Sequence, residues 1–524
     1  MSYSKKNIVF CIILLCLCLN SIQARDTSFT DKRKYPNRKS IKGLQPDSQD
    51  INQIVGNEVH TIAINIVWAY WQPTLKKSSC SGGEFLYNGL CYKLNQGEIN
   101  TIKQYTKAEV MVTAIVYGVP DWAKRSCKEA VAQMFCAPTD QGSKYYGLFA
   151  QFIAYYFNGE NGNGRIADFV IHNEVNAIGW FNFGCNNGNC NVDTWTTIYA
   201  QSYNNAYDGI KKEQKNAKIL ISLEHHFFKN LDYLIKSIDS VVSGETFLEK
   251  LIPKLGNRQW RIAFHSYPPD LKKPAFGAND HPHITFGNIG ALSGWLHKKY
   301  PNKPHAWEIQ LTENGINGID SSMYTAQRNY LCQAFKNILG TPGVESFIYH
   351  RLMDHNDEIR QGLALGLWRS SNSFKPAWEL FALANRKGVS ANYPSCGFEL
   401  LPYVEMVSGY NGKFHYVSTR NLPSGYRKLK SFKILRDSKA DTKLAFECRI
   451  GGPEGSQSFI SFDYNCENTF NMGPMGYLYN TKVKDSIPIY RCYVPSNGDH
   501  FISSSANCDG EGTKESLMGY GFAI

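Results

Sequence analysis

Short runs rich in β-branched residues alternate with longer amphipathic stretches between Lys39 and about Tyr349. This alternation is typical of repeated βα units around a parallel sheet. Stretches such as Tyr145–Phe157 and Tyr324–Leu339 carry apolar residues at helical spacing and predict connecting helices. Eight runs predict strands: Ser40–Leu44, Thr61–Val67, Val110–Val116, Asp168–His172, Lys218–Leu223, Arg261–His265, Trp307–Leu311 and Glu345–Tyr349. Eight such units indicate an α/β fold closed into a (β/α)8 barrel rather than an open sheet.

Functional residues of such a barrel lie just after the C-terminal ends of its strands. Here polar, titratable and aromatic residues follow the second to the eighth run. In strand order they are Trp68 and Trp71, Tyr117 and Trp122, His172 to Glu174, His225 and His226, His265 and Tyr267, Thr312 to Asn314, and His350. We therefore expect one end of the barrel to carry a ring of such side chains.

After Cys396 the helical periodicity ends, and three segments of similar length repeat one another. They begin at Leu401, Leu444 and Ile487, and the last two both end in a Met-Gly-Tyr turn. Such repetition predicts a small all-β domain, β-trefoil-like, over residues 397–524. The barrel then occupies residues 39–396, and 524 residues exceed what one core usually fills.

The N-terminus has the layout of a secretory signal peptide. Lys5 and Lys6 precede an apolar run from Ile8 to Leu19, and Ala24 offers a small residue for cleavage. The run is shorter than the ~20 residues that span a bilayer, and no second long run follows. We therefore predict a signal peptide over 1–24, a secreted protein without a membrane span, and a basic segment over 25–38; a lysosomal or other endomembrane lumen remains an alternative.

Cysteine usage agrees with an oxidising compartment. Three of the 15 cysteines lie in the signal peptide, and an even set of twelve remains. Five pairs are close in sequence and predict disulfides: Cys80 with Cys91, Cys127 with Cys136, Cys185 with Cys190, Cys448 with Cys466, and Cys492 with Cys508. Cys332 and Cys396 are left by elimination.

Charge and composition narrow the classes of partner. The net charge of +11 is spread along the chain, with an excess between Lys32 and Lys42 that is typical of a solvated segment rather than a nucleic-acid site. Cysteines or histidines at common zinc-ligand spacing are absent, so we expect no metal and no cofactor. His225, His226, His281 and His283 are interpreted as hydrogen-bonded loop or core residues. The aromatic content of 13% suits sugar stacking.

Two motifs carry the chemistry. Glu174 follows Asn173 in IADFVIHNEVN at the fourth strand, and Glu313 ends the seventh strand in WEIQLTENG. Retaining cleavage of a glycosidic bond needs two carboxyl groups about 5 to 5.5 Å apart. The motifs resemble the clan A glycoside hydrolases, the 4/7 TIM barrels, and the resemblance by strand order covers roughly Lys39 to Asn385. It implies Glu174 as acid/base and Glu313 as nucleophile.

The resemblance also implies residues that bind substrate. His265 and Tyr267 in HSYPP stand where a residue of the sixth strand commonly orients the nucleophile, and Trp368 stands where an aromatic platform follows the eighth. The family's Arg near the end of the second strand is missing between His60 and Trp71, and Asn65 is the polar interior residue there. The expected substrate-binding set is Asn65, Trp122, Asn173, His265, Tyr267 and Trp368.

These residues predict a retaining O-glycosyl hydrolase that acts on poly- or oligosaccharides. One alternative is a catalytically silent carbohydrate-binding protein, and another is a barrel hydrolase that uses its histidines with a metal. The C-terminal repeats either tether the enzyme to a polysaccharide or cell-surface glycan or brace the barrel. Candidate sugar contacts in the repeats are Phe414, Phe459, and Asp499 with His500 before Phe501.

Overall fold

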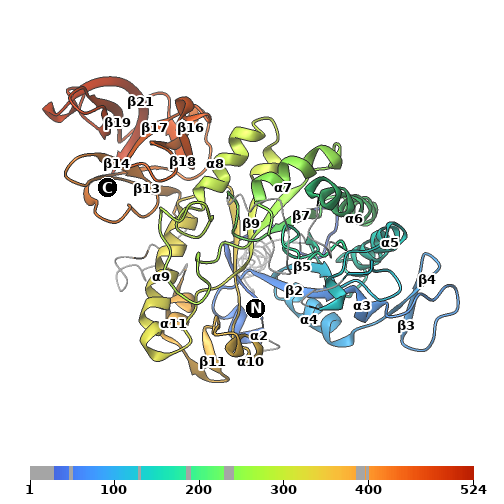
Figure 1. The fold of residues 1–524 in the computed structure, drawn as a ribbon. Coiled ribbons are helices and arrows are strands. Elements are labelled where there is room, and N and C mark those ends of the chain that lie inside the picture. The colour runs from blue at the N-terminus through green and yellow to red at the C-terminus, as the bar shows by residue number, and fades with distance from the viewer. Residues whose placement is uncertain are drawn as a thin grey trace, which may run out of the picture.

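The computed structural model describes residues 29–46, 51–127, 132–184, 191–228, 241–384, 396 and 401–524, without the side chains of residues 52 and 53. Eight parallel strands close into a barrel with helices around it, as predicted, and an antiparallel β domain follows (Figure 1). The predicted signal peptide and the pair Cys185 with Cys190 lie outside the described residues.

All eight predicted strands belong to the closed barrel. They are β1 (Lys42–Leu44), β2 (Thr61–Val67), β5 (Met111–Tyr117), β6 (Asp168–Ile171), β7 (Lys218–Leu223), β8 (Arg261–Phe264), β9 (Ile309–Asn314) and β10 (Val344–Tyr349). The largest difference from the prediction is at β9, because Trp307 ends the 3-10 helix η4 (Pro304–Trp307) and the strand extends to Asn314.

Helices connect and cover the strands. They are α2 (Ile51–Val55), α3 (Trp68–Trp71), α4 (Gln96–Lys107), α5 (Asp140–Tyr156), α6 (Val192–Glu213), α7 (Gly244–Leu251), α8 (Gly290–Lys299), α9 (Ser321–Leu339), α10 (Asn356–Arg360) and α11 (Pro376–Leu383). Side-chain caps begin most of the long ones: Thr139 accepts from Gly142 N at α5, and Asn191 accepts from Asp193 N at α6. The two hairpins, β3 (Glu84–Tyr87) with β4 (Leu90–Lys93) and β11 (Trp368–Ser370) with β12 (Ser373–Phe374), lie outside the barrel sheet.

The barrel interior is filled in its middle and open toward the C-terminal strand ends. One buried apolar side chain from each of six strands forms the filling: Ala63, Ile115, Val170, Leu220, Ala263 and Ile348. Asn65 lies two residues after Ala63 and therefore faces the same side of β2, yet it is exposed. The interior is thus accessible to solvent at the level where the strands end.

The segment before β1 packs against the opposite end of the barrel. Arg33, Lys34 and Lys39 are exposed, as expected of a solvated basic segment, whereas two other cations of this region are not. Arg38 pairs with the fully buried Asp168 at 2.7 Å, and Tyr35 donates to the same carboxylate at 2.7 Å. Lys42 is also fully buried, with its ammonium group donating to backbone carbonyls. These cations are drawn inward because the strand starts present acidic groups and carbonyl oxygens that need partners.

The β domain contains three units of three strands. The units are β13 (Tyr403–Tyr410), β14 (His415–Ser418) and β15 (Arg427–Leu435); β16 (Thr442–Ile450), β17 (Gln457–Ser461) and β18 (Phe470–Tyr479); and β19 (Ser486–Val494), β20 (Asp499–Ser503) and β21 (Thr513–Ala523). In each unit the first strand lies between the other two, and the third strands of the units pair with one another. The threefold repetition is therefore present, whereas a β-trefoil arrangement is not confirmed.

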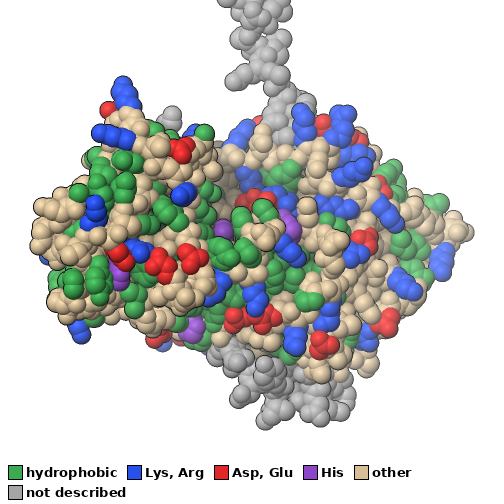
Figure 2. Space-filling view, turned by 90° about the horizontal axis from the view of Figure 1, so that it is seen from above, with side chains coloured by type: hydrophobic (Ala, Val, Ile, Leu, Met, Phe, Trp, Pro, Cys, Tyr) green, Lys and Arg blue, Asp and Glu red, His purple; other side chains and the backbone are tan. Residues whose placement is uncertain are grey.

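The β domain is packed directly against the barrel. A Cβ atom on Gly290 of α8 would lie 2.2 Å from Met472 O, and one on Gly473 would lie 2.2 Å from Gly290 O, so the two backbones meet without side chains between them. Thr419 also donates to Gly340 O at 2.8 Å. Figure 2 shows the two parts as abutting lobes, with acidic and basic side chains interspersed over this face. Among the described residues, no helix has the length and apolar character needed to cross a membrane.

The described part of the chain contains five disulfides. Four are predicted short-range pairs, Cys80–Cys91, Cys127–Cys136, Cys448–Cys466 and Cys492–Cys508, and the fifth is Cys332–Cys396. The last bond anchors the chain after α11 to helix α9. It therefore fixes the start of the connection into the β domain.

Candidate active site

The end of β6 carries Glu174 in a strained loop conformation. His172 and Glu174 both have positive φ, 60° and 38°, which non-glycine residues adopt rarely. The backbone N–H of Glu174 donates to Ser222 Oγ at 2.9 Å, so the neighbouring strand β7 holds the turn in place. The turn directs the Glu174 carboxylate toward the end of β8.

An irregularity in β9 positions Glu313. Leu311 pairs with Phe347 and Asn314 with Tyr349, so two residues of β9, Thr312 and Glu313, lie opposite a single residue of β10. An extra residue of this kind changes the face that the following side chain points to. Asn314 then accepts hydrogen bonds from Ser266 N at 2.7 Å and Ser266 Oγ at 2.9 Å, which fixes the strand end against the β8 loop.

Both carboxylates are held by residues that follow β8. His265 Nδ1 lies 2.7 Å from Glu174 Oε1, and the Tyr267 hydroxyl donates to Glu313 Oε1 at 3.1 Å. One oxygen of each glutamate and a ring nitrogen of His265 all lie within 4.8 Å of one another. The structure therefore brings Glu174, Glu313, His265 and Tyr267 together in one cluster at the C-terminal strand ends.

The two carboxyl groups have pKa values displaced in opposite directions. Burial raises the pKa of Glu174 above its ordinary value, and the negative charge of Glu313 adds to this, although His265 opposes it. Burial also acts to raise the pKa of Glu313, but His265, His350 and the hydrogen bond from Tyr267 outweigh it, so the net pKa is lowered. Burial lowers the pKa of His265, yet Glu313 and Glu174 more than compensate and raise it. At mildly acidic pH this arrangement favours one protonated and one ionised glutamate.

A second histidine extends the network beside Glu313. His350 follows β10, where its Nδ1 contacts Gln45 Oε1 and its Nε2 lies 3.0 Å from Glu358 Oε1. The sequence places His350 at a strand end, but Gln45 and Glu358 carry no motif that would identify them. Both are found only in the fold, where Gln45 follows β1, the strand that pairs with β10, and Glu358 lies in α10, in the connection after β10.

The expected polar substrate contacts lie at the same end of the barrel. Asn173 is 5% exposed, and its Oδ1 atom has no hydrogen-bond partner among the described residues. Asn65 is exposed on the inner face of β2. A buried amide oxygen without a partner is costly unless a ligand or water completes it, so Asn173 can accept a hydrogen bond from a ligand hydroxyl.

The two expected aromatic contacts, Trp122 and Trp368, differ in their exposure. Trp122 packs edge-on against Trp68, and its indole N–H donates to Gln72 O at 3.0 Å. Trp368 is only 3% exposed, because its ring is packed against Phe374 and Trp378. Trp368 is therefore used for packing, which leaves little of its ring for a sugar face, whereas Trp122 is partly exposed and part of its ring remains accessible.

A different aromatic row borders the carboxylate pair. Tyr117 ends β5 and contacts Phe135, which in turn contacts Trp180 at 4.6 Å between ring centroids. All three are partly exposed. Burial and then the charge of Glu313 raise the pKa of Tyr117 to about 12, so this ring is electrostatically close to the cluster. Trp180 lies in the loop after β6, six residues after Glu174. This closeness to the Asn-Glu motif is the sequence signal that could have identified it.

In the described part of the chain, three groups of side chains could hold a metal ion, because their potential ligand atoms lie within 4.8 Å of one another. Cys80 and Cys91 with Glu84 form one, but both sulfurs are joined in a disulfide. Glu174, His265 and Glu313 form the second, and His225, His226 and His283 the third. Only the third consists of donors that transition metals prefer without a competing covalent bond or carboxylate pair.

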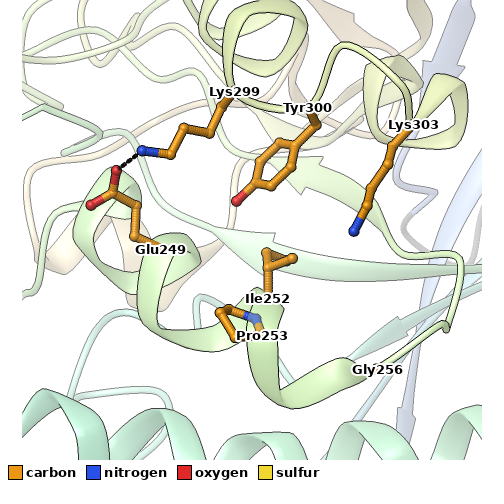
Figure 3. Close-up of a pocket in the computed structure, with 7 residues that line it drawn as sticks. All are labelled: Glu249, Ile252, Pro253, Gly256, Lys299, Tyr300 and Lys303. Carbon is orange, nitrogen blue, oxygen red and sulfur yellow. Dashed lines mark hydrogen bonds and ion pairs between the residues drawn. The ribbon is translucent and has the colours of Figure 1, made fainter.

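A pocket of about 450 Å³ lies away from these groups (Figure 3). Glu249, Lys299, Tyr300 and Lys303 are among its lining residues, and Lys299 is paired with Glu249. It is formed by the end of α8 and by the turns that lead into the starts of β8 and β9. The pocket therefore lies toward the N-terminal strand ends, away from Glu174 and Glu313.

Several solved structures are similar to this chain. A fungal β-1,4-galactanase is 11% identical with a TM-score of 0.42, covering 65% of this chain and 94% of that one. A family 39 glycoside hydrolase from the gut symbiont Bacteroides cellulosilyticus WH2 is 12% identical with a TM-score of 0.43, covering 90% and 77%. The Ignisphaera aggregans GH53 catalytic domain is 12% identical with a TM-score of 0.41, covering 69% and 97%.

Sequence comparison gives a family for the barrel. No curated protein matches the chain. Residues 34–393 match a model described as a family of unknown function (DUF5722). The matched range begins in the segment before β1 and ends after α11, so it contains every strand of the barrel and both candidate glutamates. The match spans more than half of the chain, and the protein therefore belongs to this family, DUF5722.

Proposed function

We propose that this protein is a secreted retaining glycoside hydrolase with Glu174 as acid/base and Glu313 as nucleophile. The observation that carries the proposal is the carboxylate pair at the ends of β6 and β9, with one oxygen of each within 4.8 Å of the other. Retaining glycosidases separate the two carboxyl groups by about 5 to 5.5 Å, whereas inverting enzymes leave room for a water with about 6.5 to 9.5 Å. The short separation supports direct attack by one glutamate.

In the first step, the Glu313 carboxylate attacks the anomeric carbon while Glu174 gives its proton to the glycosidic oxygen. The bond from the anomeric carbon to that oxygen breaks, and an ester bond to Glu313 forms. In the second step, Glu174 takes a proton from a water that attacks the same carbon, and the ester bond breaks. Glu174 ends protonated and Glu313 ionised, as both began.

The electrostatics support this assignment of roles rather than the reverse. Burial and the neighbouring Glu313 charge raise the pKa of Glu174, as an acid requires. His265, His350 and Tyr267 lower the pKa of Glu313 against the effect of burial, as a nucleophile requires. His265 and Tyr267 are positioning residues in this proposal, and Asn173 with the row Tyr117, Phe135 and Trp180 would bind the sugar.

The proposal of secretion is supported by the predicted signal peptide and by the disulfides. Five disulfides in the described chain are typical of proteins that fold in an oxidising compartment. Solvent access at the level of Asn65 suits a substrate that enters from the C-terminal strand ends. Polysaccharide or oligosaccharide is the substrate class.

The test is a screen of the mature protein on β-glucan, mannan, xylan and aryl β-glycosides, with Glu313→Gln as the matched control. On a substrate that is cleaved, proton NMR of the first product should show the starting anomeric configuration. An activated 2-fluoro glycoside should label the protein, and peptide mapping should place the label on Glu313. An inverted first product, or a label elsewhere, would reject the retaining assignment; a silent protein across the screen would favour the carbohydrate-binding alternative.

A further inference from the structure

Three histidines lie together at the same end of the barrel but outside the carboxylate pair. His225 and His226 lie in the loop after β7, where Glu224 precedes them, and His283 lies in the connection between β8 and α8. The ring centroids of His225 and His226 are 4.5 Å apart, and those of His226 and His283 are 4.7 Å apart. One ring nitrogen of each histidine lies within 4.8 Å of the other two.

A buried carboxylate fixes the ring of His226. Glu224 is 6% exposed and contacts His226 Nδ1 through Oε2, and it accepts from the His226 backbone N–H at 3.0 Å. Asn176 Nδ2 donates to Glu224 Oε1 at 2.9 Å and so holds the carboxylate in turn. Because Nδ1 is engaged, Nε2 is the nitrogen that His226 offers to a ligand. A carboxylate behind a histidine is the usual outer partner in a zinc site.

The donor set selects one class of ion. Imidazole nitrogens suit zinc, copper and nickel, whereas calcium and magnesium require oxygen ligands. Zinc binds nitrogen at about 2.0 to 2.1 Å, which places tetrahedral ligand nitrogens about 3.4 Å apart. The separations between the three ring nitrogens, which are within 4.8 Å, therefore need to decrease by at most about 1.4 Å to bind zinc.

We propose that His225, His226 and His283 bind a divalent transition-metal ion of the zinc class, with Glu224 orienting His226 and a fourth position left for water or a substrate oxygen. This departs from the sequence expectation of no metal. The ion would join the loop after β7 to the connection between β8 and α8, and that connection begins with His265 and Tyr267. None of these ligands is Glu174 or Glu313, so zinc binding can be tested independently of the proposed hydrolase.

Zinc binding tests the proposal on the full mature chain. After EDTA treatment and dialysis, titration with ZnCl2 in a calorimeter should give one saturable ion per chain. Glu224→Gln should weaken zinc binding by about 10- to 100-fold, as for other outer partners. His226→Ala and His283→Gln should weaken it further, because each removes a ligand.

The matched control is His281→Gln. His281 lies in the same connection as His283, but its ring stacks on Phe228 and does not belong to the cluster. It should bind zinc as the wild type does. Equal affinity in the wild type and His226→Ala, or no saturable binding in the wild type, would overturn the proposal.

A measurement on the wild-type chain avoids any folding defect of the variants. One equivalent of CoCl2 should give the strong visible absorption of four-coordinate cobalt, and ZnCl2 should abolish it by displacement. The weak spectrum of six-coordinate, hydrated cobalt would contradict the proposed geometry.

Discussion

His265 Nδ1 lies 2.7 Å from Glu174 Oε1, and this contact couples the charge of His265 to both glutamates. For the wild type we expect a bell-shaped pH profile of kcat/KM. Its acidic limb should follow ionisation of Glu313 below the ordinary glutamate pKa, and its alkaline limb should follow loss of the Glu174 proton above it.

His265→Gln should move both limbs toward higher pH. His265 lowers the pKa of each glutamate, so its removal lets both pKa values rise. The measurement is the pH dependence of kcat/KM for an aryl glycoside. A uniform loss of rate with unmoved limbs would show that His265 serves packing alone.

Tyr267→Phe should move only the acidic limb of the kcat/KM profile, toward higher pH. The Tyr267 hydroxyl donates to Glu313 at 3.1 Å and lowers the pKa of that carboxyl, whereas Glu174 receives no bond from it. The variant differs from the wild type by one oxygen atom, which makes it the partner experiment to His265→Gln. An equal displacement of the alkaline limb would contradict the separate roles of the two residues.

Replacing each glutamate by alanine should produce two different defects. Glu313→Ala should abolish turnover, and azide or formate should restore cleavage of an activated glycoside with an inverted product. Glu174→Ala should lose about 10²- to 10⁴-fold on poor leaving groups and much less on good ones, because only the poor ones need the proton. Wild-type rates of either variant on an unactivated substrate would reject the assignment.

The ion pair of Arg38 with Asp168 should be important for barrel stability. Their side chains are 11% and 0% exposed, so Arg38→Met leaves a buried carboxylate without its cation. We expect the free energy of unfolding in urea to fall by about 3–5 kcal/mol. The neighbouring Lys39→Met is the control, because its pair with Glu109 is half-exposed and should change stability by less than about 1 kcal/mol. Similar decreases in the free energy of unfolding of the two variants would contradict the expected importance of the buried pair of Arg38 with Asp168.

Deleting the β domain after residue 400 should destabilise the barrel. This truncation keeps Cys396 for its bond with Cys332 and exposes the α8 surface around Gly290 and Gly294, which packs on Met472 and Asn471. We expect a lower melting temperature or insoluble protein. An unchanged melting temperature with lost retention on insoluble polysaccharide would instead favour a tether.

The candidate sugar contacts in the repeats are divided between the interior and the surface of the β domain. Phe459 and Phe501 are buried beside the disulfides of the second and third units, and Asp499 is 1% exposed. Phe459 and Asp499 are thus used inside the domain. Phe414 and His500 remain partly exposed, and His500 lies beside Glu515 at 3.7 Å. Recurring aromatic residues at matched repeat positions indicate a shared core as readily as a shared site.

The sequence by itself determined the elements and the two glutamates. Strand runs such as Thr61–Val67 and helices such as α5 are visible because side-chain periodicity is a local property. Glu174 and Glu313 could be assigned to strand ends, and short-range pairs such as Cys448–Cys466 follow from spacing alone. Trp368 shows the limit of this reasoning, because a strand-end position does not say whether a ring packs or stays exposed.

Only the tertiary structure decided which side chains meet. The two-against-one pairing at Thr312 and Glu313 depends on the register with β10, and the contact of His350 with Glu358 depends on how α10 folds back. His283 joins His225 and His226 only because the connections after β7 and β8 are neighbours in the closed barrel. Closing the barrel brings together residues that are far apart in the chain, and local periodicity carries no information about which of their side chains meet.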